Sequence, residues 1–234
     1  MALDVGCSVG GVGYALRRRF PDCALWGCEL DAKAAELARQ HFDQVIQQDV
    51  ENLDLKALGL EKPFDLICLL DVLEHLFNPW MLLQGLHRIA TDDAQVLVSL
   101  PNASNLPLLY DAVRGHWRYR DQGLLDFTHL RFFTDFDARK MFYQTGWRML
   151  KHHVTFLGTG GNIFEAHRNA TFPMTLTLGE QELSVRVAST GDLIRLCADQ
   201  NIYLLAPHHD QLDTEYERNM ASTDYPVTYA FGMG

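Results

Sequence analysis

The sequence predicts an α/β protein built on a doubly wound, mostly parallel sheet of seven strands, with a β-rich segment inserted before the last strand. Short apolar runs alternate with helix-forming segments from residue 2 to about residue 150, which is the pattern of successive βα units. A glycine-rich turn joins the first apolar run to the first helix, as it does at the ligand-binding edge of open α/β sheets.

Seven apolar runs have the length of strands and are separated by polar or turn-forming residues. They are Ala2–Val5, Ala24–Cys28, Gln44–Gln48, Phe64–Leu70, Gln95–Leu100, Trp147–Phe156 and Asn201–Ala206. Before the last of them, the segment Thr171–Val187 alternates Thr and Leu around Gly179-Glu180, which predicts a β-hairpin. This hairpin belongs to an insertion over residues 157–200.

Four segments between the strands have helix-forming composition or recognisable helix caps. They are Val12–Phe20, Asp31–His41, Trp80–Ala90 and the segment from Thr134 to Gly146. Asn78 and Pro79 predict the N-cap and the first residue of the third helix, because proline is favoured where no backbone N–H is needed.

We divide the chain into three parts on this pattern. Residues 1–156 form the sheet core, residues 157–206 contain the insertion hairpin, a helix and the last sheet strand, and residues 207–234 form a polar C-terminal tail. The chain starts inside the first predicted strand without a preceding helix. We therefore expect a truncated start or a boundary in a longer parent protein, with an upstream domain fused to or associated with this one.

Composition and charge narrow the classes of partner. The chain has 234 residues, of which 47% are apolar, and this suits one domain with an elaboration. A formal net charge of -10 gives no overall attraction for phosphate backbones, so we expect no nucleic-acid partner. No apolar stretch approaches the ~20 residues that span a bilayer. The five cysteines are odd in number and lack C-x-x-C spacing, which favours a reduced, cytoplasmic setting.

The strongest local signal is the segment Leu3–Gly13, in which a strand runs into a glycine-rich turn and then a helix. Glycine lets the backbone pass close beneath a ligand, because no Cβ blocks the approach. We assign Gly6, Cys7, Ser8 and Gly10 to a ligand-binding loop. The dinucleotide pattern G-x-G-x-x-G fails here, since position 8 is serine.

Acidic residues lie at the carboxyl ends of four successive predicted strands, namely Asp4, Glu29, Asp49 and Asp71. Ligands of open α/β sheets bind outside that edge, so we expect the four carboxylates to face one crevice. A pyrophosphate-bearing dinucleotide disfavours nearby anions, whereas S-adenosylmethionine has no phosphate and carries sulfonium and ammonium cations. The acidic rim therefore predicts S-adenosylmethionine as cofactor and S-adenosylhomocysteine as product.

Two of these acids have predicted partners on the adenosine part of the cofactor. Glu29, nineteen positions after Gly10, is placed to accept hydrogen bonds from both ribose hydroxyls. Asp49 can accept from the adenine amino group.

With these residues the chain resembles the class I S-adenosylmethionine-dependent methyltransferases, in the small-molecule, ubiquinone-type O-methyltransferase branch, from residue 2 to about residue 150. The resemblance implies a Rossmann-like sheet whose first cofactor loop is Asp4-Val-Gly-Cys-Ser-Val-Gly10. Ser8 departs from the family, which usually has glycine there. This makes the loop less permissive, although the serine hydroxyl can itself contact the cofactor.

The resemblance also implies roles further along the chain. Glu29, with Leu30 beside it, takes the ribose role, and Asp49 with Val50 takes the adenine role. The run Phe64–His75 becomes the fourth strand and its following loop, which carries Asp71.

The predicted catalytic residues are His75, His129 and Glu74. Methyl transfer from a sulfonium is an in-line displacement with an activated leaving group, so the protein must mainly position the acceptor. An oxygen or nitrogen acceptor can also need a base. In Asp71-x-x-Glu74-His75 these side chains share a face if the segment is helical, and His129 is a second candidate base.

The same residues resemble a metal site. An acid-x-x-Glu-His sequence with a distant His is similar to the set that holds a divalent metal in ubiquinone-pathway O-methyltransferases and in small-RNA 3′-end ribose methyltransferases. Asp71, Glu74, His75 and His129 would then lower the pKa of an acceptor hydroxyl. Similar Asp-Val-Leu-Glu-His stretches occur in relatives not known to need a metal. We therefore favour a metal-free histidine base, and a purely structural role is the third interpretation.

The acceptor region is predicted after the fifth strand, where Pro101–Asn105 precedes Gly115–Arg120 and where this family commonly recognises its acceptor. Aromatic and basic side chains there can stack a ring and pair with an anion, or instead form a lid on the cofactor pocket. Thr128–Thr134 looks like methyltransferase domains found beside glycosyltransferases. We expect methylation of a small-molecule or glycan-type acceptor on oxygen.

Two other classes of function stay open. A chain that binds S-adenosylmethionine without turnover would be a non-catalytic module within a larger protein, an alternative raised by the clipped N-terminus. An NAD-type oxidoreductase would bind a dinucleotide, and the acidic rim argues against it.

Overall fold

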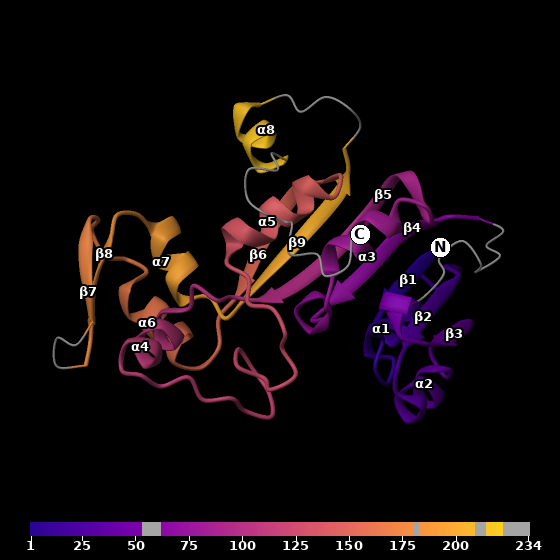
Figure 1. The fold of residues 1–234 in the computed structure, drawn as a ribbon, viewed down its shortest axis with the longest axis horizontal. Coiled ribbons are helices and arrows are strands. Elements are labelled where there is room, and N and C mark those ends of the chain that lie inside the picture. The colour runs from indigo at the N-terminus through magenta and orange to yellow at the C-terminus, as the bar shows by residue number, and fades with distance from the viewer. Residues whose placement is uncertain (53–61, 180–182, 209–213, 222–234) are drawn as a thin grey trace.

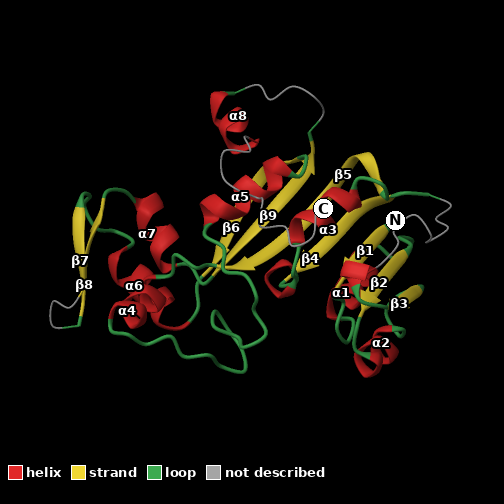
Figure 2. Ribbon diagram, viewed as in Figure 1, coloured by secondary structure: helices red, strands yellow, loops and turns green. Residues whose placement is uncertain are grey.

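The structure is a computed structural model that describes residues 1–52, 62–179, 183–208 and 214–221. Its centre is a seven-stranded sheet with the strand order β3-β2-β1-β4-β5-β9-β6 (Figures 1 and 2). The strands are β1 (Ala2–Val5), β2 (Leu25–Glu29), β3 (Gln44–Gln47), β4 (Phe64–Leu70), β5 (Ala90–Pro101), β6 (Trp147–Thr155) and β9 (Gln200–Pro207).

Strands β1 to β5 pair in parallel, and β9 runs antiparallel to both of its neighbours, β5 and β6. The strand order reverses between β1 and β4, which is where open α/β sheets bind their ligands. The predicted doubly wound, mostly parallel sheet of seven strands is therefore confirmed.

Eight helices and two short 3-10 turns connect the strands within the described ranges. The helices are α1 (Gly11–Arg19), α2 (Ala32–Ala38), α3 (Pro79–Leu86), α4 (Leu106–Val113), α5 (Asp135–Gln144), α6 (Gly158–His167), α7 (Thr190–Cys197) and α8 (Glu215–Ala221). The 3-10 turns are η1 (Val50–Asn52) and η2 (Leu73–His75). None of these helices has the length and apolar character needed to cross a bilayer.

The predicted helix caps form. Asp31, Asn78 and Thr134 each accept a hydrogen bond from a backbone N–H in the first turn of the helix that follows. Helix α3 ends at Leu86, four residues before the predicted end, because β5 already begins at Ala90. Only the second half of this long strand, from Gln95, is the continuous apolar run that the sequence pattern selects.

The main core lies between the sheet and the helices α3 and α5. The central strands read as nearly continuous apolar runs because helices cover both sheet faces, and Ile67 and Val96 are fully buried. Trp147 is also fully buried, and its indole N–H donates to the Leu83 carbonyl at 2.9 Å. This contact connects the start of β6 to α3.

The insertion forms a smaller unit at one end of the sheet (Figure 1). Between β6 and β9 the chain contains α6, the predicted hairpin of β7 (Met174–Leu178) and β8 (Leu183–Val187), and α7. Gly179 has a φ of 64°, and its predicted turn partner Glu180 lies outside the described residues. Leu106 of α4 packs in the apolar cluster of this insertion, together with Leu176 and Leu193.

Helix α4 belongs to residues 1–156, the predicted sheet core, yet it contacts the insertion.

The division into residues 1–156, 157–206 and 207–234 stays a prediction. Much of the predicted tail, residues 209–213 and 222–234, lies outside the described residues. The described helix α8 packs on α5, where the Lys140 ammonium donates to the Asn219 carbonyl at 3.1 Å.

Candidate active site

The glycine turn after β1 is built from left-handed backbone. Gly6, Ser8 and Gly10 have φ angles of 67°, 46° and 94°. A Cβ on Gly6 would lie 2.8 Å from Val72 Cγ2, and one on Gly10 would lie 3.1 Å from the Ala38 Cα. Both positions therefore need glycine for two reasons, the backbone angle and the lack of space. Ser8 adopts the same region although it has a side chain.

A pocket of about 410 Å³ lies at the carboxyl ends of β1 to β4. Six of the predicted cofactor-binding residues line it, namely Gly6, Glu29, Leu30, Asp49, Val50 and Asp71. The other four do not line it. Asp4 and Cys7 are buried in the sheet edge, while Ser8 and Gly10 belong to the turn above.

The two acids predicted to hold adenosine are fixed by backbone N–H groups. The Glu29 carboxylate accepts from the Ser8 N–H at 2.8 Å and from the Asp31 N–H at 2.9 Å. Asp49 accepts from the Glu51 N–H at 2.9 Å. Each carboxylate keeps further lone pairs for a ligand, since an ionised carboxylate has about four acceptor positions.

Asp4 is the penultimate residue of β1 and is only 2% exposed. Burial, reinforced by the charge of Glu29, raises the pKa of Asp4 to about 7. Its Oδ2 atom has no hydrogen-bond partner among the residues that the structure describes. Three of the four predicted carboxylates thus line one pocket, and the fourth, Asp4, interacts electrostatically with Glu29 in its wall.

Asp71 occupies an unusual backbone position at the end of β4. Its φ of 54° is uncommon for a residue other than glycine. The Ser99 hydroxyl donates to Asp71 Oδ1 at 2.8 Å, and the Gln200 amide donates to both carboxylate oxygens at 2.9 and 3.0 Å. The sequence prediction missed Ser99 and Gln200, which lie 28 and 129 residues away in the chain and follow no local motif.

The three predicted catalytic residues come together. One potential ligand atom from each of Glu74, His75 and His129 lies within 4.8 Å of the others, and the two imidazole centroids are 4.7 Å apart. The segment Asp71–His75 is not an α-helix, so helical spacing does not place these side chains on one face. Instead, η2 is a single 3-10 turn that follows Asp71, whose backbone is left-handed. Contact with a distant loop assembles the group instead. The Leu130 and Arg131 N–H groups donate to the Glu74 carbonyl at 2.8 and 3.0 Å.

Hydrogen bonds define the tautomers of the two imidazoles. The His129 Nδ1 atom lies 3.2 Å from the Leu124 carbonyl, which only accepts, so Nδ1 carries the proton and Nε2 is free to accept one. His75 Nδ1 lies 3.0 Å from the Thr128 hydroxyl. That hydroxyl donates to Asp126 at 2.6 Å and therefore accepts from His75. Both histidines thus hold Nε2 available for a proton or a ligand.

Burial shifts the ionisation of two of these groups. It lowers the pKa of His129, so that the neutral imidazole dominates at neutral pH. It raises the pKa of Glu74 to about 8, and this carboxyl is only 1% exposed. Neither Glu74 oxygen has a hydrogen-bond partner in the described part of the chain.

These orphaned oxygens fit a metal ion or a hydroxyl as the missing partner of Glu74. The four-residue ligand set does not assemble, because Asp71 is outside the group and its carboxylate is bound by Ser99 and Gln200. A metal here would have three protein ligands, Glu74, His75 and His129.

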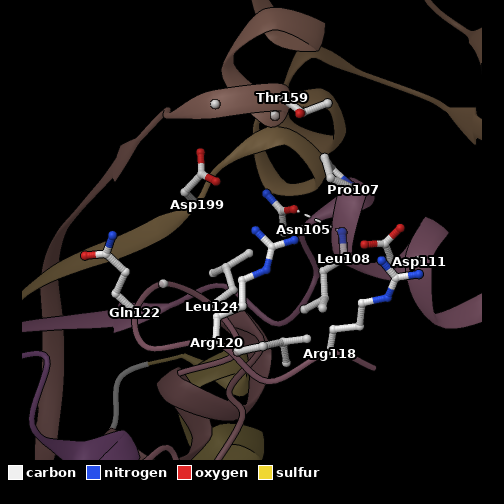
Figure 3. Close-up of a pocket in the computed structure, with 14 residues that line it drawn as sticks. Asn105, Pro107, Leu108, Asp111, Arg118, Arg120, Gln122, Leu124, Thr159 and Asp199 are labelled. Carbon is white, nitrogen blue, oxygen red and sulfur yellow. Dashed lines mark hydrogen bonds between the residues drawn. The ribbon is translucent and has the colours of Figure 1, made fainter. Parts of the chain in front are cut away.

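Three pockets follow one another along the carboxyl edge. A central pocket of about 420 Å³, which contains Glu74 and His129, shares Asp71 and His75 with the cofactor pocket. It also shares Gly123, Leu124, Gly158 and Asp199 with a third pocket of about 360 Å³, shown in Figure 3. The arrangement can therefore hold a cofactor at one end and a second molecule that reaches the histidines from the other end.

Comparison with known proteins gives consistent matches. A family model described as a methyltransferase domain matches residues 3–96. A ubiquinone biosynthesis O-methyltransferase of Nitrosomonas europaea is 26% identical over 121 residues, which are 50% of this chain and 51% of that protein. One from Pseudomonas aeruginosa is 25% identical over 47% of this chain and 48% of its own length. The chain thus spans about half the length of the curated relatives that it matches.

Solved structures share the fold at low sequence identity. A SAM-dependent methyltransferase from Archaeoglobus fulgidus has a TM-score of 0.56 and 16% identity, covering 88% of this chain and 85% of its own. The magnesium protoporphyrin IX methyltransferase from Synechocystis, with bound SAH, has a TM-score of 0.54 and 14% identity, covering 89% and 74%.

The family match begins in β1 and includes the glycine turn, Glu29, Asp49, Asp71 and the Glu74-His75 pair. The TM-scores of 0.56 and 0.54 show that the fold of this chain is shared with these two methyltransferases. A methyltransferase-domain model thus matches residues 3–96 of this chain, and the chain shares its fold with solved SAM-dependent methyltransferases.

Proposed function

We propose that this chain transfers the methyl group of S-adenosylmethionine to an oxygen of a small-molecule or glycan-type acceptor, with His129 as the general base. One observation carries the proposal. His75 and His129 line a pocket that borders the cofactor pocket, and each imidazole keeps Nε2 available. The curated relatives named as O-methyltransferases support oxygen as the acceptor atom.

The cofactor is assigned to the pocket of about 410 Å³. Glu29 accepts from the ribose hydroxyls and Asp49 from the adenine amino group, through the lone pairs that their backbone partners leave free. Asp71 and the buried Asp4 supply negative potential for the sulfonium and ammonium groups. A cation beside Asp4 favours its ionised form and lowers the pKa from about 7.

The chemical step requires alignment and one proton transfer. The acceptor hydroxyl lies in the central pocket, where His129 Nε2 takes its proton as the oxygen attacks the methyl carbon. The carbon–sulfur bond breaks in line with the new carbon–oxygen bond, and S-adenosylhomocysteine leaves as a neutral thioether. His75 shares the pocket and is polarised by the hydrogen-bonded pair of Thr128 and Asp126.

A divalent metal is the alternative means of activating the hydroxyl. Glu74, His75 and His129 would hold it, and the metal would lower the pKa of the acceptor hydroxyl. A chelator separates the two mechanisms. Turnover that survives prolonged dialysis against EDTA supports the free histidine base, whereas turnover that is lost and is restored by Mg²⁺ or Zn²⁺ supports the metal.

The function is tested in two stages on the full chain. Calorimetric titration with S-adenosylmethionine and with NAD compares the two cofactors, and we expect binding of the first alone. Mass spectrometry then measures S-adenosylhomocysteine released with a panel of phenols, sugars and sugar acids. Binding without turnover across the panel would favour a non-catalytic module, and preferential binding of NAD would favour an oxidoreductase.

A further inference from the structure

The third pocket is polar and lies on the side of the central pocket away from the cofactor. Its walls come from the loop that carries Arg118 and Arg120, from the start of α4 and from the first turn of α6 (Figure 3). Because it shares Leu124 and Gly158 with the central pocket, a molecule whose hydroxyl reaches His129 can extend directly into it.

Two cations enter this pocket from one loop. In Figure 3 the Arg118 and Arg120 side chains extend from the loop toward α4, with their guanidinium groups directed at Asp111 and Asn105. Neither guanidinium belongs to an ion pair with another described residue. Two arginines that converge on a cavity without such a partner offer charge-assisted, forked hydrogen bonds to a carboxylate or phosphate.

Helix α6 adds backbone donors on the opposite wall. It begins with Gly158, Thr159 and Gly160, which all line the pocket, and its N-cap residue Leu157 provides no side-chain capping bond. The first N–H groups of a helix lack intrahelical partners and favour an anion. The arginines and the start of α6 thus supply donors from two sides.

The same pocket is also lined by two acidic residues, so its ligand should carry hydrogen-bond donors in addition to a negative charge. Asp111 and Asp199 balance the two arginines in formal charge, and Gln122 adds an amide. Carboxylate and amide oxygens accept hydrogen bonds from hydroxyl groups, which are the groups that a sugar presents at every face. A long apolar chain would bury these polar groups without partners.

We propose that this pocket binds the far end of the methyl acceptor, a polyhydroxylated ring that carries an anionic group, either a carboxylate or a phosphate. Arg118, Arg120 and the start of α6 hold the anion, while Asp111, Asp199 and Gln122 accept from ring hydroxyls. The inference rests on the proposed function for the position of the methylated oxygen. Binding in the pocket itself does not depend on turnover.

The test uses the intact chain and calorimetric titration at constant ionic strength. The probes are glucuronate, glucose 6-phosphate and glucose, which share the ring but differ in the anion. The test variant is Arg118→Gln combined with Arg120→Gln. Arg88→Gln, an exposed arginine that does not line the pocket, is the matched control. Affinity for S-adenosylmethionine, measured for each variant, reports whether the fold and the cofactor site are intact.

We expect at least one of the two acids to bind roughly tenfold or more tightly than glucose, because charged hydrogen bonds to arginine add to those of the hydroxyls. The double variant should remove this difference and keep its affinity for the cofactor, and Arg88→Gln should change neither. Preference for glucuronate or for glucose 6-phosphate identifies the anion as a carboxylate or a phosphate.

Equal binding of glucose and both acids, no saturable binding of either acid in the millimolar range, or unchanged acid binding by the double variant would overturn the inference. These outcomes are separate from the proposed function. Acid binding that depends on the arginines supports the pocket even in a chain without turnover. Methylation of an acidic acceptor at an unchanged KM in the double variant would contradict the pocket and leave the methyltransferase proposal intact.

Discussion

The proposed cofactor side and the proposed acceptor side of this site are assembled differently. On the cofactor side, Gly6, Glu29, Asp49 and Asp71 each lie at the carboxyl end of a strand of the parallel sheet or within two residues of it. On the acceptor side, the lining comes from the loop around residues 118–129, from α6 and from the start of β9. Sheet geometry alone places the first group, whereas packing between distant segments places the second. Substitutions on the two sides should therefore affect different measurements.

His129→Ala gives the largest expected effect and tests whether the acceptor side acts in chemistry alone. We expect kcat to fall by roughly 10²- to 10⁴-fold, the usual contribution of a general base. The affinity for S-adenosylmethionine should not change, because His129 does not line the cofactor pocket. Release of S-adenosylhomocysteine and calorimetry measure the two quantities. His153→Ala, an exposed histidine of β6, is the control. Loss of folding in His129→Ala would instead indicate a structural role.

Asp4→Asn tests the buried charge beneath the cofactor side. The pKa of Asp4 is about 7 in the folded chain and 3.8, the ordinary value of an aspartate, in the unfolded chain, so ionisation opposes folding. Its favourable contribution is fully present below pH 3.8 and is lost as the pH rises through about 7. We expect the free energy of unfolding to fall over this interval by an amount on the order of a few kcal/mol.

The Asp4→Asn variant should lack this part of the pH dependence, which urea unfolding at pH 5, 6, 7 and 8 would measure. Asp31→Asn is an exposed control from the same sheet edge. A parallel pH profile in wild type and Asp4→Asn would contradict the shifted pKa.

Glu29→Ala tests the cofactor side without touching the histidines. Loss of charged hydrogen bonds to the ribose should weaken S-adenosylmethionine binding by about 1.5–3 kcal/mol. Turnover at saturating cofactor should be much less affected than in His129→Ala. Calorimetry supplies the affinity, and Glu36→Ala on the exposed face of α2 is the control. An unchanged affinity would remove Glu29 from the cofactor site.

Gln200→Ala tests the connection between the two sides and has the smallest expected effect. The Gln200 amide holds Asp71, which lines both the cofactor pocket and the central pocket. Its loss should cost about 1 kcal/mol, or roughly fivefold, in cofactor affinity and in kcat together. Titration and steady-state kinetics of the same variant check this. A change in only one of the two would show that Asp71 serves one side alone.

The sequence predicted the parallel sheet, and it named six residues that line the pocket of about 410 Å³, because both depend on short local patterns. Strands β1 and β4 have the predicted bounds, since their apolar runs end at a glycine turn or an acid. Asp31, Asn78 and Thr134 cap helices where expected, because capping involves only the following turn.

The acceptor side was predicted only in part, because its geometry depends on contacts that no local pattern encodes. The three catalytic candidates lie close together in the structure, and their catalytic roles stay a prediction. The segment that carries Glu74 and His75 is a 3-10 turn, so α-helical spacing does not align them. Gln200 is the first residue of β9, and nothing nearby in the sequence marks it as the partner of Asp71. Helix α6 lies across the third pocket from Arg118 and Arg120, and this position depends on how the insertion packs against α4.

The central claim is that the acidic rim holds the cofactor so that its sulfur faces the histidine pocket. A crystal structure of the chain with S-adenosylhomocysteine tests it most directly. We predict the ribose hydroxyls on Glu29, the adenine at Asp49, and the sulfur at the border marked by Asp71 and His75. A ligand in another position, or one whose sulfur points away from His129, would contradict the account.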